Sequence, residues 1–215
     1  MNTGNSAASG FNTAGVGKGD IKSECDELKE EADKEDRKIQ AMRKTPKGAT
    51  AHKCTTVTAS KLTCGGVTTK KPAYSSLSRL PKGRQSRYAQ GVKRGEPSKM
   101  CKKKNGEDFE HATQGFSSGC SHTEARLVED AFKGPGGAEG CELMMKIKWK
   151  QRVVFKNPQG KITGAKNVAP LAKPCKDCEK VLCHAQYCGL KIFLCKIKQG
   201  RQEKVKPPPC KKHGY

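Results

Sequence analysis

Residues 141–150, "CELMMKIKWK", alternate between apolar and polar side chains. The apolar residues would share one face of a strand: Leu143, Met145, Ile147 and Trp149. Lysines occupy most of the opposite face. A period of two with one apolar face is typical of a strand that is buried on one side. The stretch therefore predicts a half-buried strand, and the segments on either side of it indicate what packs against it.

Two amphipathic helices are predicted around this strand. The first lies in "GCSHTEARLVEDAF", residues 119–132, and the second in "PCKDCEKVLCHAQYCG", residues 174–189, where Gly189 provides a stop. Residues 190–198, "LKIFLCKIK", form a nearly continuous apolar run, which is typical of a strand covered on both faces. Strands that alternate with helices in this way indicate an α/β layered domain.

The N-terminal third gives weaker signals. Residues 1–20 are rich in Gly, Ser, Asn and Thr and are interpreted as a flexible leader, and residues 21–43 as a polar, charged helix. Residues 54–70, "CTTVTASKLTCGGVTTK", predict a hairpin that turns at two glycines. We expect residues 1–75 to form a partly flexible N-terminal segment and residues 76–215 to form the functional domain.

The chain is strongly basic, with 43 Lys or Arg against 21 Asp or Glu and a net charge of +22. Residues 141–215 carry 18 of the basic residues and only 4 acidic ones, which is +14. A surplus of this size favours a polyanionic partner such as nucleic acid, an anionic membrane or an acidic protein. The start of the chain lacks the pattern of a secretory signal, and no apolar run approaches the roughly 20 residues of a membrane span. We therefore expect a soluble protein that binds no membrane.

Twelve cysteines are many for a chain without a secretory signal, and six of them lie between Cys175 and Cys210. An even number suggests disulfides, but the missing signal gives more weight to metal binding or to reduced thiols. Cys175 and Cys178 form a C-x-x-C at the start of the second helix. This motif has several interpretations: half of a structural zinc site, a redox pair, or coincidence in a cysteine-rich region.

The start of the first helix also has two interpretations. Ser121-x-x-Glu124 has the form of a capping box, in which both side chains satisfy backbone amides. Alternatively, His122 joins the two thiolates of the C-x-x-C in a three-ligand set that suits Zn²⁺ and leaves a fourth position for water. Glu124 could then lie beside that water as a general base without binding the metal.

His122-Thr-Glu124 followed by Pro174-Cys175-Lys-Asp-Cys178 resembles the H-x-E…P-C-x-x-C signature of the zinc-dependent cytidine deaminase-like superfamily. Within it, the chain looks most like the deaminase modules of bacterial polymorphic toxins. The resemblance implies a three-layer α/β/α fold with a mixed sheet. It also implies that His122, Cys175 and Cys178 bind Zn²⁺ and that Glu124 carries protons.

The resemblance further implies an antibacterial toxin that deaminates cytosine, or less readily adenine, in DNA or RNA. Trp149, Tyr187 and His184 are candidate substrate-binding residues, since aromatic rings stack on bases. Such a toxin implies a cognate immunity protein, plausibly acidic. It also implies delivery into the cytoplasm of a target cell by a specialised machine, such as type VI secretion or contact-dependent delivery.

Two departures from the family pattern concern the fold. His122 and Cys175 are 53 residues apart, and the excess lies in residues 152–173, which predict an additional strand or loop with a turn at Asn157-Pro158. The two strands expected before the first helix are either the hairpin at 54–69, with a long insertion after it, or unrecognised strands within residues 88–118.

A different class of function remains open at this point. Cys183, His184, Cys188 and Cys195 could supply a closed structural zinc site. The chain would then be a non-catalytic, cysteine-rich zinc module that binds nucleic acid.

Overall fold

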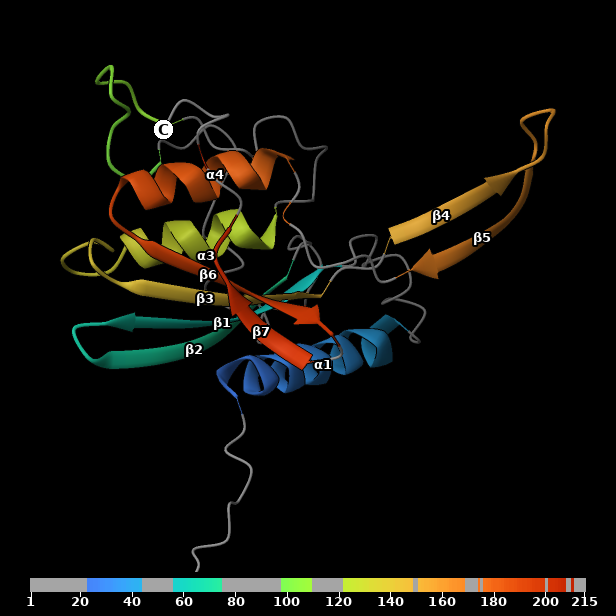
Figure 1. Ribbon diagram of the computed structural model, residues 1–215, viewed down its shortest axis with the longest axis horizontal. Helices are drawn as coiled ribbons and strands as arrows, with labels where there is room; N and C mark the ends of the chain where they lie inside the picture. Colours follow the sequence, from blue (N-terminus) through green and yellow to red (C-terminus); the bar gives the residue numbers. More distant parts are fainter. Residues whose placement is uncertain are drawn as a thin grey trace, which may run out of the picture.

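The computed structural model describes residues 23–43, 56–74, 98–109, 122–148, 151–168, 174, 176–199, 201–207 and 210. Three helices and seven strands lie within these residues (Figure 1). In chain order they are α1 Glu24–Arg43, β1 Val57–Cys64, β2 Val67–Tyr74, α3 Thr123–Phe132, β3 Glu142–Lys148, β4 Gln151–Lys156, β5 Ile162–Val168, α4 Lys176–Tyr187, β6 Lys191–Lys198 and β7 Arg201–Val205.

Five strands form a mixed sheet in the order β2-β1-β3-β6-β7. β3 and β6 run parallel, with Leu143 opposite Ile192, and every other neighbouring pair is antiparallel. Helices α3 and α4 lie on one face of the sheet and α1 lies on the other (Figure 1). The expected α/β layered fold with a mixed sheet is therefore confirmed.

The connections at one end of β3 and β6 explain why both helices on this face run in the same direction. Gly140 N donates to Gly189 O at 3.0 Å, and Lys191 N donates to Cys141 O at 2.9 Å. The loops that leave α3 and α4 therefore lie side by side before β3 and β6 begin. Gly189 has φ +86°, and a Cβ there would come within 2.8 Å of Glu139 Cγ, so this close approach needs glycine.

β3 is buried on both faces, so the prediction of a half-buried strand is wrong. Leu143, Met145 and Ile147 pack in the core beneath α3 and α4, as expected, but Met144 packs on the opposite side against Leu28 of α1. Lys146 shares that opposite side and is only 8% exposed. Its Nζ donates to Gln202 Oε1 at 2.6 Å and to Cys195 O at 3.3 Å, while burial lowers its pKa. The second face of β3 is covered because α1, which lies much earlier in the chain, packs on it.

Helix α1 confirms the helix predicted over residues 21–43, but it belongs to the main body. Its apolar side packs on the sheet through Cys25, Leu28 and Ala32. On its polar side, Asp33 and Asp36 accept from Lys148 Nζ of β3 at 2.6 and 3.1 Å. The boundary expected between residues 75 and 76 therefore divides elements that share one sheet and one core.

The hairpin predicted at 54–69 is confirmed as β1 and β2, and it supplies two strands before helix α3. Gly65 and Gly66 form its turn with φ +53° and +81°, which suits the tight turn between twisted strands. β1 pairs directly with β3. The intervening residues 75–97 and 110–121 lie outside the described part of the chain, and residues 98–109 contain no strand.

The predicted additional segment after β3 forms a second, two-stranded sheet. β4 and β5 pair antiparallel with each other and bracket the turn at Asn157-Pro158. Among the described residues, no helix has the length and apolar character that crossing a membrane requires.

Eight of the nine cysteines in the described part of the chain are paired in disulfides, whereas we expected metal binding or reduced thiols from the missing secretory signal. The pairs join distant elements: Cys25–Cys195, Cys64–Cys141, Cys101–Cys188 and Cys183–Cys210. Cys25–Cys195 links α1 to β6 across 170 residues of sequence. Such links restrict the unfolded chain and support a protein of modest hydrophobic content.

Replacing Cys25 and Cys195 together by alanine should lower the free energy of unfolding by about 2–5 kcal/mol, because the longest of these loops is then open in the unfolded state. Urea denaturation followed by circular dichroism measures this change. The matched pair Cys183→Ala/Cys210→Ala opens a loop of only 27 residues. It should cost about 1–2 kcal/mol less by the loop-closure relation. A Cys25/Cys195 variant as stable as the wild type would contradict the assigned bridge.

Candidate metal centre

Three side chains from two helices meet where α3 and α4 begin. His122 directly precedes α3, Glu124 is the second residue of α3, and Cys178 is the third residue of α4. One ligand atom from each lies within 4.8 Å of the others, close enough to hold one metal ion. Both helices begin at the end of β3 from which the chain leaves toward β4, so the parallel strand pair brings together residues that are 56 positions apart.

His122 and Cys178 form the closest pair, with His122 Nδ1 2.9 Å from Cys178 Sγ. His122 is half-buried, whereas Cys178 is fully buried. Cys178 is the one cysteine of the described residues that is in no disulfide, so it offers a thiol where the other cysteine sulfurs are bonded in pairs. An imidazole nitrogen and a thiol sulfur are both common ligands of zinc and of other borderline metal ions.

Glu124 is held at this site by two threonines that the sequence analysis missed. Thr123 Oγ1 donates to Glu124 Oε2 at 2.8 Å, and Thr58 Oγ1 of β1 lies 2.6 Å from Thr123 Oγ1. Because the Thr123 hydroxyl gives its one proton to the carboxylate, the Thr58 hydroxyl donates to Thr123. Thr58 and Thr123 are both fully buried. This relay ties the orientation of the carboxylate to the hairpin.

The start of α3 differs from the capping box that the sequence suggested. His122 occupies the N-cap position, with φ −73° and ψ 140°, and its side chain makes no capping hydrogen bond. Glu124 is therefore one position too early in the helix to be the third residue that a capping box requires. The structure thus leaves the Glu124 carboxylate directed at the site rather than at a cap amide.

The remaining predicted residues divide into two groups. Cys175, the third predicted ligand, and Trp149, a predicted substrate contact, lie outside the described residues. His184 and Tyr187 lie in the last two turns of α4, whereas Cys178 lies in its first turn. His184 is six residues beyond Cys178, which is about 9 Å along a helix axis.

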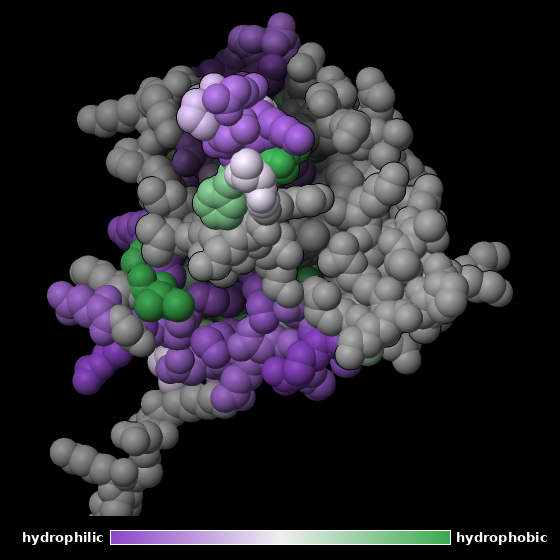
Figure 2. All heavy atoms as spheres, turned by 90° about the vertical axis from the view of Figure 1, so that its right-hand side faces the viewer, coloured by the Kyte–Doolittle hydropathy of each residue, from purple (hydrophilic) through white to green (hydrophobic). Residues whose placement is uncertain are grey.

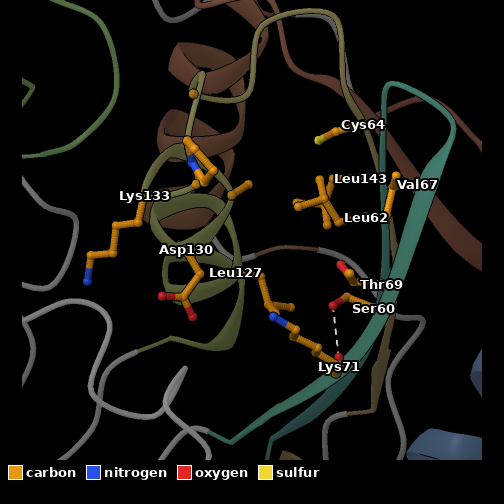
Figure 3. Close-up of a pocket in the computed structure, with 14 residues that line it drawn as sticks. Ser60, Leu62, Cys64, Val67, Thr69, Lys71, Leu127, Asp130, Lys133 and Leu143 are labelled. Atoms are coloured by element: carbon orange, nitrogen blue, oxygen red, sulfur yellow. Dashed lines mark hydrogen bonds between the residues drawn. The ribbon is translucent and has the colours of Figure 1, made fainter.

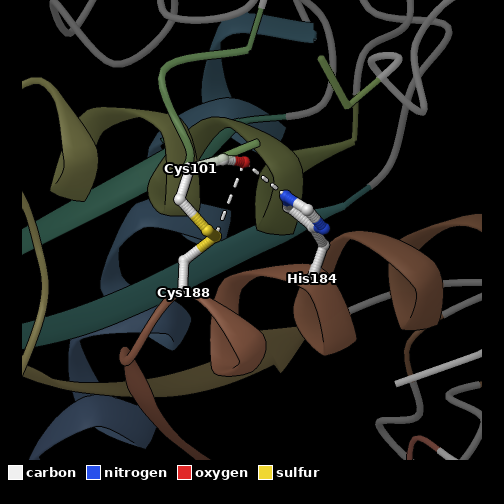
Figure 4. A group of neighbouring side chains, drawn as sticks. All are labelled: Cys101, His184 and Cys188. Carbon is white, nitrogen blue, oxygen red and sulfur yellow. Dashed lines mark hydrogen bonds between the residues drawn. A yellow bond between two sulfur atoms is a disulfide. The ribbon is translucent and has the colours of Figure 1, made fainter. Parts of the chain in front are cut away.

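His184 lies in a separate cluster with Cys101 and Cys188 (Figure 4). The two cysteines are joined by a disulfide, so they offer no thiolate unless they are reduced. His184 Nε2 lies 2.7 Å from Cys101 O, which requires the ring proton on Nε2. Cys183 and Cys195 are also in disulfides. The closed zinc site that these cysteines could have formed is therefore not present in the disulfide-bonded protein.

Burial lowers the pKa of His184, and the nearby Lys103 charge acts in the same direction, while the bond to Cys101 O and the Glu129 carboxylate oppose it. The neutral ring stacks on Phe109 with ring centroids 4.6 Å apart. Tyr187 lies farther out, 42% exposed, with its centroid 5.8 Å from His184. His184 thus has a structural role in fixing residues 98–109 to α4.

The buried face of α3 carries further charge next to the centre. Glu129 is 1% exposed and accepts from Lys99 N at 2.8 Å and from Ser98 Oγ. Burial lowers the pKa of Arg126 to about 9, and the carboxylate of Asp130 opposes this shift. Glu129 therefore anchors the segment that begins at Ser98, whereas Glu124 lies with His122 and Cys178 in the candidate metal centre.

A cleft of about 570 Å³ lies on the same face of the sheet, between the β1–β2 hairpin and the second half of α3 (Figure 3). Leu62, Leu127 and Leu143 give it an apolar floor, and Asp130 and Lys133 lie at its helical side. None of the three clustered residues lines it. The cleft and the metal centre are therefore separate features of α3.

Comparison with known proteins adds no further identification, because no protein-family model, curated protein or solved structure matches the chain.

Replacing Cys178 by serine or His122 by alanine should lower the affinity for Zn²⁺ or Co²⁺ at least about 100-fold, since each change removes a ligand rather than its support. Metal content after desalting, and the thiolate absorption band of the Co²⁺ form, measure this loss. The matched control is His184→Gln, which alters the other His/Cys group and should keep the metal. If the control lost the metal and the Cys178 variant kept it, the metal would bind at the His184 cluster, and the assignment to His122 and Cys178 would be wrong.

The lowered pKa of His184 also predicts how stability depends on pH. The unfolded chain binds a proton at the ordinary histidine pKa of about 6.5, whereas the folded protein binds it only at lower pH. Stability is therefore full above this value and falls as the pH decreases below it. Thermal unfolding between pH 8 and pH 5 should show this fall, and His184→Gln should reduce it. An unchanged pH profile in that variant would exclude His184 as the cause.

Proposed function

We propose that this protein is a zinc-dependent deaminase that hydrolyses the amino group of cytosine, and less readily of adenine, in DNA or RNA. The observation that carries the proposal is the meeting of His122, Glu124 and Cys178 at the start of two helices. These are three of the four residues that the H-x-E…P-C-x-x-C signature would place in the reaction. The fourth, Cys175, follows the buried Pro174.

The arrangement of the sheet supports the same family. A hairpin, a helix bearing H-x-E, a strand, a helix bearing the C-x-x-C and a further strand occur in this order, and the strands β2-β1-β3-β6 lie side by side. A helix on the far face completes three layers. The order helix, strand, helix, strand around the two motifs resembles that of the cytidine deaminase-like fold, and this likeness supports the proposal.

The donor set fits zinc, because an imidazole and a thiol that is in no disulfide converge, and the predicted Cys175 would complete three protein ligands. When bound, Zn²⁺ supplies the acidity that makes a water molecule nucleophilic near neutral pH. His122 and the two cysteines would hold the ion. Four disulfides take up the other eight cysteines of the described residues, so the thiol of Cys178 is not in a disulfide, which supports its role as a ligand.

Glu124 performs the proton transfers in this mechanism. Its carboxylate takes one proton from the attacking water and gives it to the ring nitrogen, N3 of cytosine or N1 of adenine, while the water oxygen bonds to C4 or C6 and the C=N double bond opens. It then carries a second proton from the new hydroxyl to the amino group, so that the C=O bond forms, the C–N bond breaks and ammonia leaves. Thr123, supported by Thr58, holds the carboxylate in place through both transfers. Water and cytosine are thereby converted to uracil and ammonia.

The biological setting follows from the toxin resemblance. The protein would be an antibacterial effector that a specialised secretion system delivers and that acts in the cytoplasm of the target cell. The producing cell would need an immunity protein, and the net charge of +22 supports an acidic one. The same charge favours a polymeric nucleic acid over a free nucleoside as substrate.

Replacing Glu124 by glutamine should lower the deamination rate by about 10²–10⁴-fold, because general acid–base catalysis contributes this much. The zinc content and the folded structure should be retained. Cytosine-to-uracil conversion in DNA and RNA oligonucleotides measures the rate. Sequencing of nucleic acid from cells that express the protein identifies the base and the polymer together.

Glu129→Gln is the matched control, because Glu129 is a second buried carboxylate on the same helix. It accepts hydrogen bonds from Ser98 and Lys99, so its loss should reduce stability but leave the rate per folded molecule nearly unchanged. Wild-type turnover by Glu124→Gln protein would overturn the assignment of Glu124 and, with it, the mechanism.

A further inference from the structure

The β4–β5 hairpin projects away from the main sheet as a separate two-stranded ribbon (Figure 1). A hairpin of two strands is marginally stable by itself in water. Two large apolar side chains near its end are nevertheless open to solvent: Phe155 is 50% exposed and Ile162 is 62% exposed. Exposed apolar side chains on a projecting ribbon are typical of a surface that a binding partner covers.

The charge of this region restricts the kind of partner. Residues 143–176 contain nine Lys or Arg and no Asp or Glu, and four of the nine lie in the hairpin itself: Arg152, Lys156, Lys161 and Lys166. Figure 2 looks onto the side from which the hairpin projects, and the described surface there is mostly hydrophilic with small hydrophobic areas. A ribbon of one sign of charge complements a polyanion.

The tip of the ribbon is held in one conformation before any partner binds. Asn157 N donates to Lys161 O at 2.9 Å, Lys161 N donates to Asn157 Oδ1 at 2.8 Å, and Gly160 N donates to Asn157 O at 2.9 Å. Gly160 has φ +77°, which the turn requires. The exposed side chains of Lys156 and Lys161 therefore flank a fixed turn, so little backbone entropy is lost when they bind.

The dimensions of the ribbon match one groove of duplex DNA. A strand of six residues is about 20 Å long, and the major groove of B-form DNA, about 12 Å wide, admits a two-stranded ribbon. The major groove of A-form RNA is too narrow for this entry. A flat membrane surface would take an extended apolar face, whereas here two apolar residues lie among lysines at a narrow tip.

The position of the ribbon relates it to the metal centre. β4 follows β3 after two residues, and β5 is followed by α4, whose third residue is Cys178. Because α3 and α4 both begin at this end of β3, the ribbon leaves the body at the end that carries His122, Glu124 and Cys178. DNA held by the ribbon would lie at the same end of the molecule as the proposed catalytic residues.

We propose that the β4–β5 hairpin binds duplex DNA by entering its major groove, with Lys156 and Lys161 on the phosphates and Phe155, which faces Gly164 across the ribbon, against the groove floor. DNA binding by the hairpin does not depend on the proposed function. Only the statement that this DNA is the substrate rests on it. Binding is therefore measured on Glu124→Gln protein, so that loss of binding and absence of deamination are separate results.

The test compares Lys156→Gln/Lys161→Gln with the control Lys191→Gln/Lys206→Gln, which removes the same charge from two exposed lysines of the main body. Fluorescence anisotropy with a 20-base-pair DNA duplex measures Kd between about 0.05 and 0.2 M salt. The hairpin pair should weaken binding about tenfold or more and lower the slope of log Kd against log salt by about 2, one for each lost phosphate contact. The control should change Kd by less than about twofold.

Equal losses in both pairs would overturn the proposal, because binding would then follow net charge alone. Wild-type affinity in the hairpin pair would overturn it as well. The same loss on an RNA duplex of equal sequence would exclude entry into the major groove. A loss on vesicles that contain phosphatidylserine, without a loss on DNA, would assign the ribbon to a membrane. Phe155→Ser should weaken DNA binding with an unchanged salt slope, and a changed slope would contradict an apolar contact of Phe155 with the groove floor.

Discussion

The parallel pairing of β3 with β6 is the constraint on which the site depends. A parallel pair needs a crossover, which α4 supplies, and α3 reaches β3 through a loop that is hydrogen-bonded to the loop after α4. Both helices must then end where β3 and β6 begin, and must begin near the opposite ends of these two strands. His122 and Cys178 meet for this reason. The starts of helices present free amide donors and a positive dipole end, which favour thiolate and carboxylate groups.

The sequence predicted the elements whose patterns are local. The helical spacing behind His122, the apolar run at 190–198 and the glycine pair of the first hairpin all lead to the right elements. The two-sided burial of β3 was missed because its second cover, α1, lies more than a hundred residues earlier. β7 was missed because Arg201–Val205 is short and mostly polar, with a burial that comes from pairing with β6.

The site was predictable in part for the same reason. The H-x-E…P-C-x-x-C pattern singled out His122, Glu124 and Cys178, and the structure brings these three side chains together. Thr58 could not be found, because threonine in a strand is an ordinary β-branched residue and its role arises only when β1 packs beside α3. The disulfides were beyond prediction as well. Pairing depends on distances between elements, such as the 5.4 Å between the Cα atoms of Cys25 and Cys195.

Burial of the metal centre sets a condition for any reaction on duplex DNA. Glu124 is 5% exposed and Cys178 is fully buried, so a base that remains in its stack cannot reach them. In the proposed deamination, a target base in a duplex would have to leave its stack, at a cost of a few kcal/mol for unstacking and unpairing. A ribbon anchored in the major groove would offset that cost with phosphate and groove contacts made beside the extruded base. A single strand avoids the cost but offers no groove. The two substrates would thus differ in what opposes their binding. For the duplex it is the free energy of extruding the base, and for the single strand it is the loss of the groove contacts.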